Sequence, residues 1–240
     1  MRLFRQMGQN ESKTRLQIEN GIRTGRVNCA NKRLRQIPPI VIESANRIVS
    51  IDLCNNNIKR VDELVHFVKV NIVDICENDI DELPEKIDKM NLIKKFLCDN
   101  NKLSKLPTSF CNLDNLTHLT LNNNIFDKIP IALNNLEILG YLSLNNNNIR
   151  SMGNYISLPQ LYELSLQNNK IRKIPDWLCD LKRLKNLRLD HNRITETSIS
   201  PKVFKDSNIS LLSLEGNLKL NEKELHHIDG YDEVFKIFQD

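Results

Sequence analysis

The chain has 240 residues, of which 40% are hydrophobic and 27% are charged, and its formal net charge is +4 at pH 7. These values are typical of a soluble globular chain. The small net charge and the absence of a Lys/Arg run argue against a nucleic-acid partner. The opening MRLFRQMGQN has no apolar run that would indicate a signal peptide, and no stretch approaches the roughly 20 apolar residues of a membrane span. We therefore expect a cytoplasmic protein.

One pattern recurs along most of the chain. In Leu139 to Ile149, which reads LGYLSLNNNNI, leucines at the first, fourth and sixth positions precede an asparagine and an isoleucine. The spacing L-x-x-L-x-L-x-x-N-x-I is the signature of a leucine-rich repeat. The asparagine recurs every 22 to 25 residues, at Asn56, Asn78, Asn101, Asn124, Asn147, Asn169, Asn192 and Asn217.

The repeat has a direct structural meaning. Alternation around L-x-L predicts a β-strand, and the L/I-P pairs that often follow end it, because proline has no N–H for a sheet ladder. Stacked copies bury the apolar face that one copy leaves open. The predicted fold is an α/β leucine-rich repeat solenoid (horseshoe), with a parallel sheet on the concave face, short helical or 3-10 segments on the convex side, and helical caps.

The pattern also predicts the boundaries along the chain. Residues 1–24 form an N-terminal segment or capping helix, 25–220 hold about nine repeats, and 221–240 form a C-terminal helical cap. Leu16, Ile18 and Ile22 are the candidate docking residues of the first cap. The first and last copies depart from the pattern, with Lys32 replacing the asparagine and Lys219 an apolar residue, as expected of capping units.

The recurring asparagines are predicted to have a structural role. Each falls where the chain bends inward after the strand, and a buried polar group without a partner costs about 1–3 kcal/mol. We expect their side-chain amides to bond the backbone of their own and neighbouring turns as an internal ladder.

A partner is expected on the concave face. Positions two, three, five, seven and eight of each copy point out of the predicted sheet, and this face is roughly 40 Å long, which suits a protein better than a small molecule. Tyrosine and arginine are enriched among interface hot spots. The alternative to partner binding is that these side chains are only exposed to solvent. The candidate partner-binding residues are Lys94, Lys95, His118, Tyr141, Tyr162, Glu163, Lys185 and Arg188.

The cysteines lie inside the repeats: Cys29, Cys54, Cys76, Cys98, Cys111 and Cys179. Apart from Cys54 and Cys76, each is expected to pack as a small hydrophobe, and Trp177 is expected to pack on the outer side. Cys54 and Cys76 occupy equivalent positions of adjacent copies, which leaves a redox pair open. The sequence has neither metal-ligand spacing nor a catalytic motif, so we expect no metal, no cofactor and no enzymatic activity.

The N-terminal segment contains a modification motif. From Met7 the sequence MGQNES fits M-G-x-x-x-[ST], which makes Gly8 a candidate for N-myristoylation if translation starts at Met7. A single myristoyl chain gives only marginal membrane binding. Membrane association is therefore expected only through this lipid.

The copy LPTSFCNLDNLTHLTLNNNIF resembles the intracellular leucine-rich repeat proteins of the Ras-suppressor type. The stretches MGQNESKTRLQIENGIRTGRV and SLLSLEGNLKLNEKELHHIDGYDEVFKIF resemble the family of leucine-rich repeat-containing protein 57. This resemblance implies no enzymatic activity. It also implies membrane association through a lipid on an N-terminal glycine, which here is Gly8.

The leading hypothesis is a monomeric, non-enzymatic scaffold or adaptor that binds a partner protein on its concave face. One alternative is a lipid-anchored peripheral membrane adaptor. Another is a regulatory subunit of a phosphatase, small GTPase or ubiquitin ligase.

Overall fold

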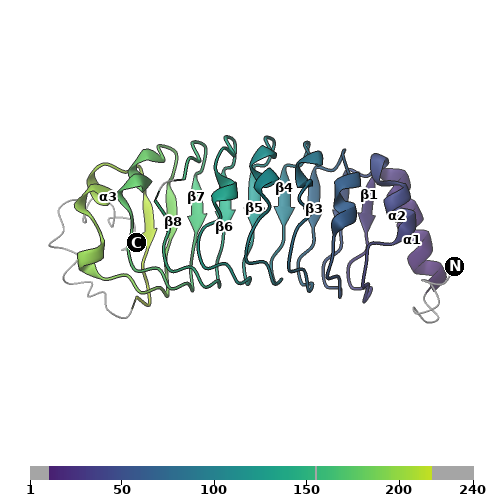
Figure 1. The fold of residues 1–240 in the computed structure, drawn as a ribbon, viewed down its shortest axis with the longest axis horizontal. Coiled ribbons are helices and arrows are strands. Elements are labelled where there is room, and N and C mark those ends of the chain that lie inside the picture. Colours follow the sequence, from purple (N-terminus) through teal and green to yellow (C-terminus); the bar gives the residue numbers. More distant parts are fainter. Residues whose placement is uncertain (1–10, 155, 218–240) are drawn as a thin grey trace. The chain divides into compact units, whose positions relative to one another are not determined.

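The computed structural model describes residues 11–154 and 156–217. The chain divides into two compact units, Met1–Leu116 and Thr117–Asp240. In both units each repeat runs through a three-residue strand, a turn and a return segment that often contains a short helix, and equivalent parts of neighbouring repeats lie side by side (Figure 1). The predicted segment 221–240 and Gly8 lie outside the described residues.

From residue 11 onward, the first unit has a helix followed by four strands, each paired in parallel with the next. Its elements are α1 (Glu11–Thr24), β1 (Arg26–Asn28), α2 (Pro39–Glu43), η2 (Ala45–Arg47), β2 (Ser50–Asp52), η3 (Asp62–His66), β3 (Ile72–Asp74), η4 (Ile87–Lys89), β4 (Lys95–Leu97) and η5 (Thr108–Asn112).

The described part of the second unit contains five strands, again parallel and in sequence order. Its elements are β5 (His118–Thr120), η6 (Ile131–Leu133), β6 (Tyr141–Ser143), β7 (Glu163–Ser165), η7 (Asp176–Asp180), β8 (Asn186–Arg188), η8 (Glu196–Ser198), α3 (Pro201–Lys205) and β9 (Leu211–Ser213). The parallel strands and short helical segments confirm the predicted solenoid fold.

The core follows the two-residue period of the strands. The middle residue of every strand points inward and is at most 2% exposed: Val27, Ile51, Val73, Phe96, Leu119, Leu142, Leu164, Leu187 and Leu212. The register aligns these residues within each unit, as in the pairing of Leu119 with Leu142. Burying each such side chain contributes roughly 1.5–3 kcal/mol, so neighbouring repeats stabilise one another.

The turn after each strand requires a left-handed backbone. Positive φ angles occur one residue before each asparagine position, at Asn31, Asn55, Glu77, Asn100, Asn123, Asn146, Asn168, His191 and Gly216. Asparagine and glycine tolerate this conformation better than most residues. At Gly216 space is also limiting, because an added Cβ would lie 2.1 Å from Nδ1 of His191.

The asparagine side chains lie inside these turns. Asn147 is 7% exposed, and its amide donates to the carbonyl oxygens of Leu121, Leu144 and Asn145 at 3.0, 3.0 and 3.1 Å. Its Oδ1 accepts the backbone N–H of Phe126 at 3.0 Å. One side chain therefore links two repeats and closes its own turn.

Helix α1 lies against β1 through its small residues. A Cβ on Gly21 would lie 2.7 Å from the backbone oxygen of Arg26, so the helix approaches the strand closely. Of the expected docking residues, Ile18 is 3% exposed, whereas Leu16 is 54% exposed. The expectation for Leu16 was wrong, because the close contact at Gly21 orients a different side of the helix toward the strand. None of the described helices is long and apolar enough to cross a membrane.

Candidate partner-binding surface

The first and third residues of each strand point away from the core. In the second unit, the outward side chains of β5 to β8 and of the residues just before them form what we call the sheet face. Six of the eight predicted partner-binding residues lie there: His118, Tyr141, Tyr162, Glu163, Lys185 and Arg188. Lys94 and Lys95 lie at β4 in the first unit, where Lys94 is exposed and Lys95 is half-buried.

The two tyrosines of the sheet face have different surroundings. Tyr141 is half-buried and stacks on His118, with ring centroids 4.2 Å apart and an interplanar angle of 5°. Tyr162 is 49% exposed and lies over Gly140, where an added Cβ would be 2.9 Å from its Cε1. The glycine thus makes room for the Tyr162 ring while leaving much of that ring open to solvent.

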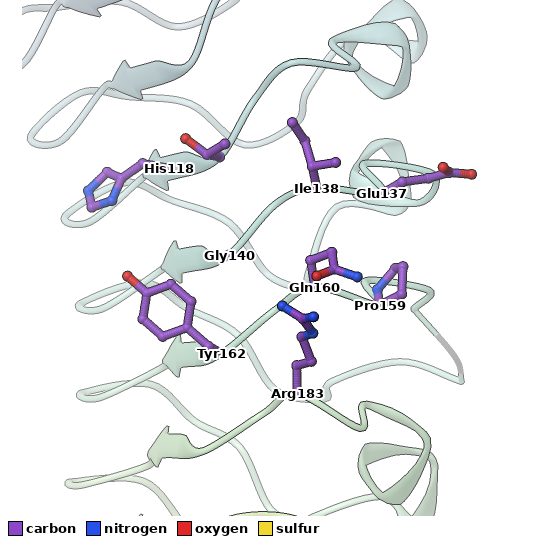
Figure 2. Close-up of a pocket in the computed structure, with 9 residues that line it drawn as sticks. His118, Glu137, Ile138, Gly140, Pro159, Gln160, Tyr162 and Arg183 are labelled. Atoms are coloured by element: carbon purple, nitrogen blue, oxygen red, sulfur yellow. The ribbon is translucent and has the colours of Figure 1, made fainter.

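A hollow of about 550 Å³ opens beside Tyr162. In Figure 2, His118 and Tyr162 project on the strand side of the hollow, and the other side chains come from segments that enter the strands. The lining residues are Thr117, His118, Glu137, Ile138, Gly140, Pro159, Gln160, Tyr162 and Arg183.

Sequence reasoning missed most of this hollow. It considered only outward positions of the strands, whereas Ile138, Gln160 and Arg183 lie before the first leucine of their copies. These three residues occupy equivalent positions in consecutive repeats. An alignment of the repeats that started one residue earlier would have placed Ile138, Gln160 and Arg183 in one column.

The charged residues of the sheet face are partly paired with one another. The Nε of Arg188 lies 3.5 Å from Oε1 of Glu163, and the Asn186 amide donates to Oε2 of Glu163 at 3.4 Å. Both side chains are half-buried, with the Glu163 side chain 17% exposed, so solvent still weakens the pair. It largely offsets the charge of Glu163, while Lys185 is exposed beside it.

Positions five and seven form a second polar ladder within the second unit. Oδ1 of Asn122 accepts the Ser143 hydroxyl at 2.6 Å and the backbone N–H of Asn145 at 2.8 Å. Oδ1 of Asn145 in turn accepts the Ser165 hydroxyl at 2.8 Å. These four side chains are therefore held by hydrogen bonds to the neighbouring repeat as well as pointing out of the sheet.

All six cysteines are free thiols. Cys29 and Cys98 are buried, whereas Cys111 and Cys179 in the return segments are half-buried. Burial raises the pKa of the Cys54 thiol from 9.0 to about 11, with the nearby Asp74 carboxylate acting in the same direction. The pKa of Cys76 is raised further by burial and Asp74, although its sulfur accepts the backbone N–H of Asp99 at 3.2 Å. Both sites therefore favour the unreactive neutral thiol.

We expect Cys54 to alkylate slowly in the folded protein. With a pKa of about 11 instead of 9.0, its thiolate fraction at pH 8 falls about 100-fold. Because the thiol must first ionise, the rate rises with pH toward 11. Iodoacetamide labelling followed by peptide mass spectrometry measures the rate, with protein in 6 M guanidinium as the control. Equal rates in the folded and unfolded protein would contradict this expectation.

The described residues provide little support for other kinds of site. No group of three or more His, Cys, Asp or Glu side chains among them is arranged to hold a metal ion. Trp177 is half-buried, and its indole N–H donates to the backbone oxygen of Gly153 at 3.2 Å, in keeping with the expected packing role.

Comparisons with known proteins agree with this architecture. A leucine rich repeat family model matches residues 151–194, whereas no curated protein matches the chain. A leucine-rich repeat protein of Leptospira interrogans is similar, with a TM-score of 0.68 and 22% identity over 83% of this chain and 57% of that one. The chain has the leucine-rich repeat fold.

Two further leucine-rich repeat structures illustrate how widely this fold is shared. Internalin C2 of Listeria monocytogenes has a TM-score of 0.66 and 22% identity, over 82% of this chain and 92% of that one. The plant peptide hormone receptor RGFR1, in complex with RGF2, has a TM-score of 0.63 and 20% identity, over 78% of this chain and 30% of the receptor chain. At these identities the similarity concerns the fold alone.

Proposed function

We propose that this leucine-rich repeat chain is a non-enzymatic scaffold or adaptor, and that a partner protein binds the sheet face of its second unit. The observation that carries the proposal is Tyr162, which is 49% exposed beside a hollow of about 550 Å³. Tyrosine is enriched among interface hot spots, and its ring loses little conformational entropy on binding.

The hollow has the properties of an anchor site for one partner side chain. Its volume lies within the roughly 300–1,000 Å³ of ordinary ligand clefts. Ile138 and Pro159 supply apolar surface, and Gln160 and Arg183 supply hydrogen-bond donors at the margin. Tyr141 is already stacked on His118, so we assign it a supporting role and assign the main contact to Tyr162.

The proposal predicts that Tyr162→Ala removes a partner without unfolding the protein. Loss of a tyrosine hot spot weakens binding about 30-fold. Capture from cell lysate with mass spectrometry compares the wild type with Tyr162→Ala, and titration calorimetry with the purified partner then measures the affinity. Ile131→Ala is the control, because Ile131 is 81% exposed in η6, outside the sheet face. Identical capture by all three proteins would refute the sheet-face site.

A second candidate function concerns location. The MGQNES motif favours a lipid-anchored peripheral adaptor with Gly8 as the acylated residue, in line with the resemblance to the family of leucine-rich repeat-containing protein 57. Membrane fractionation of the wild type and Gly8→Ala tests this. An unchanged distribution would remove the anchor and leave a monomeric cytoplasmic scaffold, while no particular residue favours a regulatory subunit.

A further inference from the structure

The segments that follow β6, β7 and β8 turn along one edge of the second unit (Figure 1). In sequence these segments carry several cationic residues. After the asparagine of the seventh repeat the chain alternates, with Lys170 and Arg172 on either side of the fully buried Ile171. We call this cluster the basic edge, and it consists of Arg150, Lys170, Arg172, Lys173 and Arg193. Lys170 is half-buried and the other four are exposed.

The stacking of repeats brings these charges close together. The backbone N–H of Lys170 donates to the Ile149 oxygen at 2.8 Å, and that of Arg193 donates to the Ile171 oxygen at 2.8 Å. Lys170 and Arg193 therefore occupy equivalent positions in neighbouring repeats, as do Arg150 and Arg172. Adjacent strands are about 4.8 Å apart, and alternate residues of an extended chain about 6.6 Å, so the cluster is roughly 10 Å across at its backbone.

On the equivalent edge of the first unit, two of the cations form ion pairs with carboxylates of the same or a neighbouring repeat. There Lys102 pairs with Asp79 at 2.6 Å, and Arg60 pairs with Asp62 at 3.2 Å and also with Glu82.

The basic edge lacks such ion pairs among the described residues. None of its five cations forms an ion pair with any described residue. Among the described residues, their only side-chain hydrogen bond runs from Lys170 Nζ to Asn148 Oδ1 at 2.6 Å.

Two carboxylates occupy equivalent positions in adjoining repeats: Asp127 corresponds to Arg150 in the preceding repeat, and Glu196 corresponds in sequence to Lys173 in the following one. The five cations of the basic edge therefore outnumber these two carboxylates. Five neighbouring like charges create a positive potential that an anionic partner relieves.

We propose that the basic edge binds an acidic segment of a protein partner, one that presents several carboxylates or phosphates on an extended chain. Three of the five residues are arginines, whose planar fork matches the two oxygens of such groups. Side chains on one face of an extended peptide repeat about every 6.6 Å, which matches the spacing from Lys170 to Arg172. No immediate chain neighbour of the five cations is aromatic, which favours an acidic peptide over nucleic-acid bases that stack on aromatic rings.

The test uses a fluorescein-labelled peptide of alternating glutamate and serine, and a second copy with phosphoserine, in anisotropy titrations at low salt. In Arg150→Gln/Arg172→Gln/Arg193→Gln, we expect about tenfold weaker binding, since three exposed charge pairs are lost. The matched control Lys86→Gln/Lys89→Gln/Lys105→Gln removes three exposed cations of the first unit. It should weaken binding less than about twofold, because these cations lie outside the cluster.

Two further variants test the proposal independently of the glutamine variant. Arg150→Lys/Arg172→Lys/Arg193→Lys retains the charge but loses the fork, so we expect an intermediate loss that does not depend on whether the glutamine variant folds. Tyr162→Ala should bind the peptide like the wild type, because the basic edge does not depend on the sheet-face site.

Several results would overturn the proposal. One is an equal loss in the glutamine variant and its control, which indicates attraction to net charge alone. Another is tighter, edge-dependent binding to a 20-base-pair DNA or to vesicles with 30% phosphatidylserine than to either peptide. A third is a lysine variant that binds neither peptide or binds both as tightly as the wild type.

Discussion

Replacing Asn147 with alanine should lower the free energy of unfolding by about 3 kcal/mol, at the upper end for one buried polar group. The side chain satisfies the backbone N–H of Phe126 and the carbonyl oxygens of Leu121 and Leu144, which belong to two neighbouring repeats. Alanine leaves all three without this partner in a turn that water reaches poorly. Urea unfolding followed by circular dichroism measures the loss.

Two variants define the cause of that loss. Asn154→Ala makes the same substitution at an exposed side chain and should change stability by less than about 0.5 kcal/mol. Asn147→Asp keeps an acceptor for Phe126 but turns a carboxylate toward two carbonyl oxygens, so it should destabilise at least as strongly at pH 7. If Asn147→Ala proved no worse than Asn154→Ala, the ladder would have no stabilising role.

Replacing Phe110 with alanine should cost about 3–5 kcal/mol, because it opens a cavity in a close-packed core. Phe110 lies in η5 and is fully buried, and its ring meets that of Phe96 edge-to-face with centroids 5.9 Å apart and an interplanar angle of 87°. The pair joins a return segment to the middle of strand β4. The same urea titration detects the effect.

Ile131→Ala provides the comparison for this position. Ile131 also lies in a short return helix, but it is 81% exposed, so its truncation should change stability by less than about 0.5 kcal/mol. Comparable losses at Phe110 and Ile131 would mean that the return segments do not pack as described.

The repeat period predicted the fold because the spacing of apolar residues along each copy determines which residues are buried. Each copy places its apolar residues at the same positions, and parallel stacking is the arrangement that buries all of them together. The packing of helix α1, at the N-terminal end of the first unit, was less predictable. Leu16 and Ile18 are both apolar, and only the close approach of Gly21 to Arg26 determines which of them is buried.

The candidate site shows more clearly how tertiary structure separates residues that the repeat pattern treats alike. Tyr141 and Tyr162 occupy adjacent positions in consecutive copies, and the repeat pattern does not rank one above the other as a binding residue. Tertiary structure separates them, because Tyr141 stacks on His118 while Tyr162 lies over Gly140 and stays open. Such differences depend on side chains from three strands, which no single copy encodes.

The sequence by itself therefore determined the repeat, the strand phase and the residues that turn inward, because these depend on spacing along the chain. Only the tertiary structure decided which outward side chains remain free. Asn122 and Asn145 are engaged in bonds between repeats, whereas Arg150 and Arg172 occupy equivalent positions in neighbouring repeats and form no ion pair with a described residue. The physical reason is that an outward position acquires its environment from the repeats beside it, about 20 residues away in sequence and one strand spacing away in space.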